Sequence, residues 1–267
     1  MNNAEKKKLD MELRLLRNTN FKNGEPDGFN RCMGTAFYAL MDISNYKSNG
    51  LTKVWEEMKV LDQTIKETKK GPQSSYASLY DALFDEADII VDDRNLEKAE
   101  RFIAEHIEDN SQKQRIANLN KMIALYKSKL SDLVDFEPVE QYADPIKNKK
   151  LNAGYEAYKK GIASGFFRFA GMFLYAVLRK TNYKRAGLVR IYNRILEIDN
   201  AIEDENCVLN DELLFYALYE ETGIICSEAF MPLAQAYLVQ YNETKTEVGY
   251  RKQVSDILNA YTAEYKL

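Results

Sequence analysis

An internal repeat is the feature that most constrains what this chain of 267 residues can fold into. When residues 28–67 are placed over residues 165–204, an offset of 137, 13 of the 40 positions are identical without a gap. At an offset of 135, residues 79–90 and 214–225 share 6 of 12 residues. This period is far longer than the roughly 33–47 residues of common helical solenoids. The sequence therefore predicts the tandem duplication of a whole helical unit.

Hydrophobic periodicity predicts an all-α fold with about six helices in each copy. Within one predicted helix, apolar residues recur three or four apart and so trace one helical face: Leu51, Val54, Trp55, Met58, Leu61 and Ile65. The predicted helices of the first copy cover residues 5–17, 28–43, 47–69, 74–87, 94–109 and 112–131. We expect the copies to cover residues 1–137 and 138–267, and to form a helical bundle or a repeat-like array.

Composition indicates an ordinary globular protein, with 45% hydrophobic and 29% charged residues and a net charge of −4. Three cysteines, none in a C-x-x-C pair and none preceded by a secretory signal, favour reduced thiols and a cytoplasmic location. The apolar run at residues 162–178 contains Arg168 and two glycines, which favours a buried core helix over a membrane span. The many Asn, Lys, Ile and Tyr residues would suit a low-GC bacterium or a phage.

Three residue pairs recur at the offset of 137 inside predicted helices: Gly34 and Gly171, Arg31 and Arg168, and Asp62 and Asp199. A glycine inside a helix costs about 1 kcal/mol relative to alanine, so the glycine pair suggests the close approach of another helix backbone. The arginines lie on otherwise apolar helices, and we expect them to pair with carboxylates, the recurring aspartates first. An anion site near a helix N-terminus is the alternative.

Charge is distributed unevenly along the second half. Residues 147–194 hold 12 Lys/Arg against one acidic residue, a net charge of +11, and residues 195–267 hold 14 Asp/Glu against four Lys/Arg, a net charge of −10. Basic residues with interleaved tyrosines flank one predicted helix corner: Arg179, Lys180, Tyr183, Lys184, Arg185, Arg190, Tyr192 and Arg194. This pattern is typical of polyanion binding. Pairing with the acidic half, within the chain or across a homodimer, and a merely solvated surface are the alternatives.

One short motif bears on catalysis. The spacing of Arg101 and His106, R-x4-H on a predicted helix, resembles the motif of HEPN ribonucleases, which are also small all-α domains. The resemblance implies that Arg101 stabilises the scissile phosphate and that His106 transfers protons. Phe102 follows the arginine where that family usually carries a polar residue, and the second copy has Ala236 and Tyr241 at the matching positions. His106 is the one histidine of the chain, so a single chain cannot build a site from several histidines.

A run of carboxylates follows the helix predicted at residues 74–87. Such clusters bind magnesium in helical nucleotide hydrolases and prenyl-chain enzymes. The spacing here fits neither class, and the cluster is not duplicated, so we interpret it as a solvated loop and expect no metal and no cofactor. Its members are Asp85, Glu86, Asp88, Asp92 and Asp93.

The sequence therefore favours a non-enzymatic helical interaction protein, adaptor-like or inhibitor-like, that binds a macromolecular partner, in the first place a protein. A nucleic-acid-binding protein that uses the basic stretch Lys147–Arg194 is the first alternative. A HEPN-like ribonuclease or a nucleotide hydrolase that holds a metal with carboxylates is the second. We expect no association with membranes.

Overall fold

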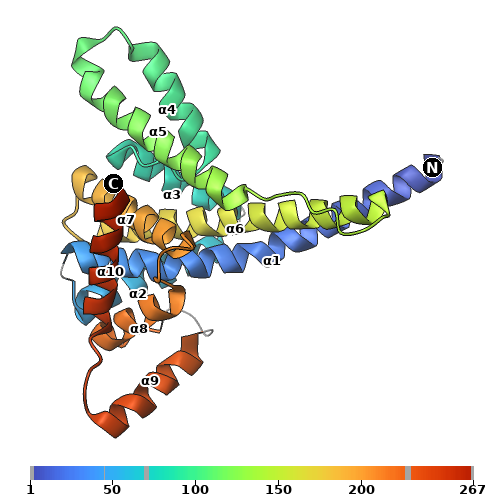
Figure 1. Cartoon of the computed structure of the whole chain (residues 1–267). Coiled ribbons are helices and arrows are strands. Elements are labelled where there is room, and N and C mark those ends of the chain that lie inside the picture. Colours follow the sequence, from blue (N-terminus) through green and yellow to red (C-terminus); the bar gives the residue numbers. More distant parts are fainter. Residues whose placement is uncertain (1–2, 45, 69–71, 226–229, 266–267) are drawn as a thin grey trace. The chain divides into compact units, whose positions relative to one another are not determined.

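The structure, a computed structural model, describes residues 3–44, 46–68, 72–225 and 230–265. Throughout these residues the fold is helical and without strands, which confirms the predicted all-α class. Cys226 lies outside the described residues. The α-helices, shown in Figure 1, are α1 (Asn3–Ser44), α2 (Ser48–Glu67), α3 (Pro72–Ala87), α4 (Asp93–His106), α5 (Lys113–Val134), α6 (Pro145–Lys180), α7 (Arg185–Glu203), α8 (Asp211–Thr222), α9 (Met231–Thr244) and α10 (Tyr250–Tyr265).

The prediction of about six helices per copy is wrong, because residues 5–17 and 28–43 belong to one helix, α1. In the described residues five α-helices precede the linker (residues 135–144) and five follow it. The segment from Asn23 to Gly28, with two glycines and Pro26, has the composition of a helix break. The helix nevertheless continues through Pro26. We attribute its continuity to the close packing of this segment against α6, described below, because tertiary packing can outweigh local helix propensity.

The chain divides into two compact units, and each takes segments from both sides of the linker. The first unit comprises residues 1–29 and 98–169, and the second comprises residues 30–97 and 170–267. Helices α1 and α6 therefore contribute to both units. The domain boundary expected between residues 137 and 138 stays a prediction.

In the first unit, α1 runs alongside α6 in the same direction (Figure 1). The two backbones touch where glycines face them. A Cβ atom added to Gly28 would lie only 2.6 Å from the carbonyl carbon of Ile162, and one added to Gly165 would lie 2.8 Å from the nitrogen of Phe29. Any side chain at these positions would push the helices apart, so glycine makes the close crossing possible.

A second pair of glycines, one turn earlier on each helix, repeats this contact. A Cβ atom added to Gly24 would lie 3.0 Å from the nitrogen of Ile162, and one added to Gly161 would lie 3.1 Å from the nitrogen of Glu25. Each helix thus presents a Gly-x-x-x-Gly face to the other. Spacing of small residues by four places both on one side of a helix, where they allow close helix packing.

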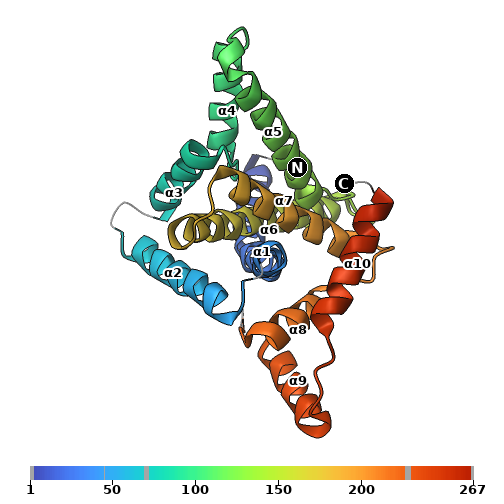
Figure 2. The same cartoon turned by 90° about the vertical axis from the view of Figure 1, so that its left-hand side faces the viewer.

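In the second unit, α10 lies against α8, and α8 also contacts α9 (Figure 2). Two further contacts pair helices from opposite sides of the linker: α3 packs against α7, and α2 packs against α8. Aromatic rings from α1 and α6 fill the core, where Phe37 and Phe173 meet edge to face with ring centroids 5.2 Å apart. The unit is therefore built from interleaved rather than separate halves of the chain.

Helix α6 is, within the described ranges, the one helix long and apolar enough to cross a membrane, with a mean hydropathy of 1.5 in an 18-residue window. Of this window, 72% is buried. The core helix of a soluble protein passes the same test, so length and composition are weak evidence for a membrane span. Phe169, Phe173 and Val177, within the run that the sequence predicts to be a core helix, are buried.

Candidate interaction groove

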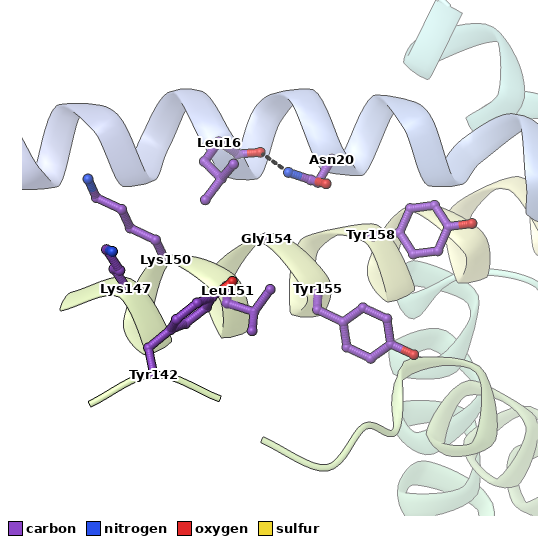
Figure 3. A pocket seen from close by; sticks show the side chains of 9 residues that line it. All are labelled: Leu16, Asn20, Tyr142, Lys147, Lys150, Leu151, Gly154, Tyr155 and Tyr158. Carbon is purple, nitrogen blue, oxygen red and sulfur yellow. Dashed lines mark hydrogen bonds between the residues drawn. The ribbon is translucent and has the colours of Figure 1, made fainter. Parts of the chain in front are cut away.

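An open groove with a volume of about 690 Å³ lies between the first parts of α1 and α6, in the first unit (Figure 3). Most of its lining comes from α6, at positions spaced four, three and four apart, which share one helical face. The residues that line the groove are Leu16, Asn20, Tyr142, Lys147, Lys150, Leu151, Gly154, Tyr155 and Tyr158.

The floor of the groove forms where α1 comes close to Gly154 of α6. A Cβ atom added to Gly154 would lie 3.2 Å from Nδ2 of Asn20 and 3.5 Å from the side chain of Leu16. The Asn20 side chain donates a hydrogen bond to the carbonyl oxygen of Leu16 at 2.9 Å, so its polar group is satisfied within α1. Because Gly154 has no side chain, the groove reaches down to α1.

Two asparagines one turn apart on α6 hold the linker beside the groove. The side chain of Asn148 accepts a hydrogen bond from the nitrogen of Tyr142 at 2.9 Å and donates one to its carbonyl oxygen at 2.7 Å. Asn152 makes the same two bonds with Val139, at 2.9 and 3.3 Å. This pair of double hydrogen bonds, the asparagine clamp, fixes Tyr142 in the groove wall without any regular strand.

The groove wall exposes large apolar surfaces to solvent. Tyr142, Tyr155 and Leu151 are 48%, 45% and 37% exposed. Phe136 of the linker meets the ring of Tyr155 edge to face at 5.6 Å. The Tyr158 hydroxyl donates to Asp27 at 2.5 Å, and this hydrogen bond raises the pKa of Tyr158 above its ordinary value. Grouped, exposed apolar side chains with a polar rim are typical of a binding surface.

Lysines form that rim. Lys147 places its ammonium 5.6 Å from the centre of the Tyr142 ring, and Lys150 pairs with Glu12 of α1 at 2.7 Å. The hydrogen bond from Lys150 lowers the pKa of Glu12. Both lysines belong to the stretch Lys147–Arg194 whose positive charge stands out in the sequence. The groove therefore combines an apolar wall with a basic edge.

The recurring arginines lie in different surroundings. Arg31 binds the fully buried Asp199 through two hydrogen bonds of 2.5 and 2.6 Å and also pairs with Glu203 at 2.6 Å. These hydrogen bonds outweigh the effect of burial, which acts in the opposite direction, and raise the pKa of Arg31. Asp199 is the partner expected from the sequence, and it comes from the other side of the linker. The contacts of Arg31 indicate a structural role in the second unit.

Arg168 pairs instead with Glu25 of α1 at 3.2 Å, within the first unit. Asp62 pairs with its neighbour Lys66 at 2.6 Å on the surface of α2. The surroundings of the recurring glycines also differ from expectation, because the nearest atoms belong to side chains rather than to another helix backbone. A Cβ atom added to Gly34 would lie 3.5 Å from Leu214, and one added to Gly171 would lie 2.5 Å from the ring of Tyr80.

The basic helix corner is engaged with carboxylates. Arg179 and Lys180 pair with Glu57 at 2.8 and 2.9 Å, and Glu57 is only 5% exposed. Arg185 pairs with the buried Asp88 at 2.7 Å. These acids come from the first half of the chain rather than from the acidic segment 195–267.

The remaining residues of the corner are divided between the interior and the surface. Arg194 is largely buried and pairs with Asp42 at 2.8 Å and with Glu197 at 3.1 Å. Tyr192 is fully buried and donates a hydrogen bond of 3.1 Å to a backbone carbonyl oxygen. Tyr183 is half-buried over Gly187, and two cations, Lys184 and Arg190, are exposed. The structure thus brings the corner together as a set of ion pairs in which the side chains of Arg179, Lys180 and Arg185 remain 49%, 43% and 39% exposed.

The R-x4-H motif forms the C-terminal end of α4. The His106 ring stacks on Phe102 with ring centroids 4.3 Å apart, and its Nδ1 lies 2.9 Å from the carbonyl oxygen of Phe102. Arg101 is exposed. One ring nitrogen of the histidine is therefore engaged with the backbone of its own helix.

The carboxylate run caps a helix rather than gathering around a point. Asp92 accepts a hydrogen bond of 2.8 Å from the nitrogen of Asn95 at the start of α4 and pairs with Arg94 at 2.9 Å. Asp88 is buried against Arg185, as described above. In the part of the chain that the structure describes, no three His, Cys, Asp or Glu side chains are placed to hold a metal ion.

Comparisons with known proteins give no relative: no family model matches the chain, and no curated protein or solved structure is significantly similar to it. Fold and groove place it in a broad class, all-helical proteins with an open, apolar and basic-edged groove. The contacts within the groove and around the other candidate residues are therefore the basis of the functional proposals.

Proposed function

We propose that the chain is a tandem duplication, now of a five-helix unit. The ends of its helices support this. Lys47 and Lys184, 137 residues apart, precede α2 and α7 with similar extended backbones, φ −91° and ψ −178° against φ −105° and ψ −175°. Asp88 and Gly223, 135 residues apart, follow α3 and α8 in the left-handed region, with φ 56° and 68°. Residues other than glycine rarely adopt the left-handed backbone conformation, so its occurrence at Asp88 and at the equivalent Gly223 supports a common origin of the two halves.

Two ion pairs of the second unit give further support. Asp42 pairs with Arg194, and Glu57 pairs with Arg179. The offset of 137 relates Asp42 to Arg179 and Glu57 to Arg194, so the two ion pairs join equivalent positions with acid and base exchanged. An experimentally determined structure tests the proposal. Residues 28–67 should superpose on 165–204, and unlike surroundings of these segments would refute it.

We also propose that the protein is a non-enzymatic interaction protein whose groove binds a helix of a protein partner. The observation that carries this is the groove wall, where Tyr142, Leu151 and Tyr155 are exposed yet held in place around a floor formed by α1. An apolar groove with a few polar groups at its edge is the usual receptor for an amphipathic helix. The asparagine clamp supports the proposal, because a preorganised wall loses less entropy on binding.

The contacts elsewhere favour this function over the alternatives. Binding to phosphates needs exposed cations that release counterions. Four cations of the basic corner are each paired with a carboxylate that offsets their charge, and one of them, Arg194, is only 14% exposed. In the R-x4-H motif, the His106 ring is stacked on Phe102 and bonded to its carbonyl oxygen, which favours a structural role for this histidine.

A pull-down from extract of the native host, with and without nuclease, tests the proposed function. The baits are tagged wild type, Leu151→Asp in the groove wall, and Ile107→Asp as a control at another exposed apolar position of the first unit. Wild type and the control should retain a protein, the chain's own untagged copy included, that Leu151→Asp loses. Equal capture by all three baits, or capture that nuclease abolishes, would contradict the proposal.

A further inference from the structure

The partner of the groove can be specified further from the chain itself, on the assumption that the proposed function holds. We propose that the groove of one molecule binds α9 of a second copy of this chain. The groove and an exposed apolar face of α9 would then account for each other.

Helix α9 exposes an apolar face. Its buried residues are Ala234 and Tyr237, which face α8. On another side, Met231, Leu238 and Val239 are 42%, 45% and 59% exposed. Residues seven and eight apart share one helical face, and this spacing is that of the anchors with which an amphipathic helix enters a groove.

The charges of the two surfaces are complementary. Within Met231–Thr244 the one charged residue is Glu243, so α9 brings no cation to a contact. The groove offers Lys147 at its edge, beside Lys150, which pairs with Glu12. On a larger scale, residues 147–194 carry +11 and residues 195–267 carry −10. Ion pairs with acids of the first half of the chain offset part of this positive charge within the molecule. The charge that remains attracts the acidic part of another molecule over about 10 Å at moderate salt.

The lengths also agree. From Lys147 to Tyr158 the groove follows twelve residues of α6, a distance of about 17 Å at the rise of an α-helix. The anchors of α9, from Met231 to Val239, span about 12 Å by the same measure. The three apolar anchors therefore fit within the length of the groove, with Glu243 one turn beyond them. Because each chain carries both the groove and α9, the contact produces either a reciprocal dimer or a head-to-tail assembly.

Complementation between two variants tests this inference. Leu151→Asp disables the groove, and Leu238→Asp disables the face of α9; both positions are exposed, so the fold should persist, as circular dichroism can verify. Sedimentation should show self-association of wild type that either substitution weakens by about tenfold or more, the effect expected of a central contact. A mixture of tagged Leu151→Asp and untagged Leu238→Asp should associate, because one intact groove meets one intact α9. Val208→Asp, at an exposed position that belongs neither to the groove lining nor to α9, is the control.

Failure of the inference differs from failure of the proposed function. A wild-type protein that stays monomeric up to its solubility limit, or variants that do not complement each other, would overturn the α9 contact. If Leu151→Asp still loses a partner from extract in that case, the groove remains a binding site for another protein. Should the aspartate variants unfold, Leu151→Ala and Leu238→Ala repeat the experiment with less disruption, and unchanged association of both would again overturn the contact.

Discussion

Replacing Gly28 or Gly165, two glycines at the crossing of α1 and α6, with alanine should destabilise the protein. A Cβ atom on Gly28 would lie 2.6 and 2.8 Å from backbone carbon atoms of Ile162, and one on Gly165 would lie 2.8 Å from the nitrogen of Phe29. Ordinary contacts are 3.4–4 Å long, so the two backbones must move apart. Forcing an extra carbon into a packed site costs about 1–3 kcal/mol, occasionally more. The higher helix propensity of alanine offsets about 1 kcal/mol of this cost.

The expected net loss is therefore up to about 2 kcal/mol of unfolding free energy for Gly28→Ala and a similar loss for Gly165→Ala. The loss should be alike in the two variants because the glycines make equivalent contacts. The double variant should lose less than the sum, since one displacement of the helices accommodates both side chains. Equilibrium unfolding in urea, followed by circular dichroism, measures these free energies.

Gly34→Ala is the matched control. It lies in the same helix, but its added Cβ would sit 3.5 Å from a Leu214 side-chain atom, an ordinary contact. Alanine should then stabilise the protein by about 1 kcal/mol, the gain in helix propensity. If Gly28→Ala and Gly165→Ala stabilise the protein as Gly34→Ala does, the two helices do not cross closely, and the reasoning is refuted.

Three further outcomes are expected. Asp199→Asn should cost about 2–3 kcal/mol of unfolding free energy because it breaks the buried pair with Arg31, whereas Asp62→Asn at the equivalent position should cost under about 0.5 kcal/mol. Equal costs of the two substitutions in urea unfolding would contradict the burial of Asp199. Asn152→Ala should speed cleavage of the linker by a glutamate-specific protease without changing the melting temperature, and an unchanged cleavage rate would mean that the clamp does not hold the linker. Gel shifts at low salt should detect no binding to single-stranded or duplex DNA, and binding that Arg190→Ala weakens would favour the nucleic-acid alternative.

The sequence predicts helices well where the pattern is local. The apolar stripe that begins at Leu51 corresponds to buried positions of α2. Helix α2 ends at Glu67 and α3 begins at Pro72, whereas Gly71 of the expected break lies outside the described residues. The continuity of α1 through Pro26 could not be predicted from composition. The repeat offset does pair Gly24 with Gly161 as well as Gly28 with Gly165, and this double match was the available signal for the close helix crossing.

The ion pairs and the groove depend on distant residues and were harder to predict. Arg194 meets Asp42, 152 residues away, and no property of either residue specifies the other. The spacing of Asn148 and Asn152 by four residues places them on one face of α6, but the sequence does not show that the linker folds back along that face. Local sequence patterns are thus sufficient to predict most helices, whereas the groove depends on how α1, α6 and the linker pack together.

Site-specific photo-crosslinking tests the central claim, that the groove binds a protein helix, most directly. A photoreactive phenylalanine analogue replaces Tyr155 in the groove wall or, as a control, Ile107, which is also exposed in the first unit. In host extract, the analogue at position 155 should crosslink one protein segment whose apolar residues have the spacing of an amphipathic helix, from a second copy of the chain or from another protein. The additional substitution Leu151→Asp should abolish this crosslinked product. Crosslinks at position 155 that are as sparse and diverse as those at position 107, or that join nucleic acid, would contradict the claim.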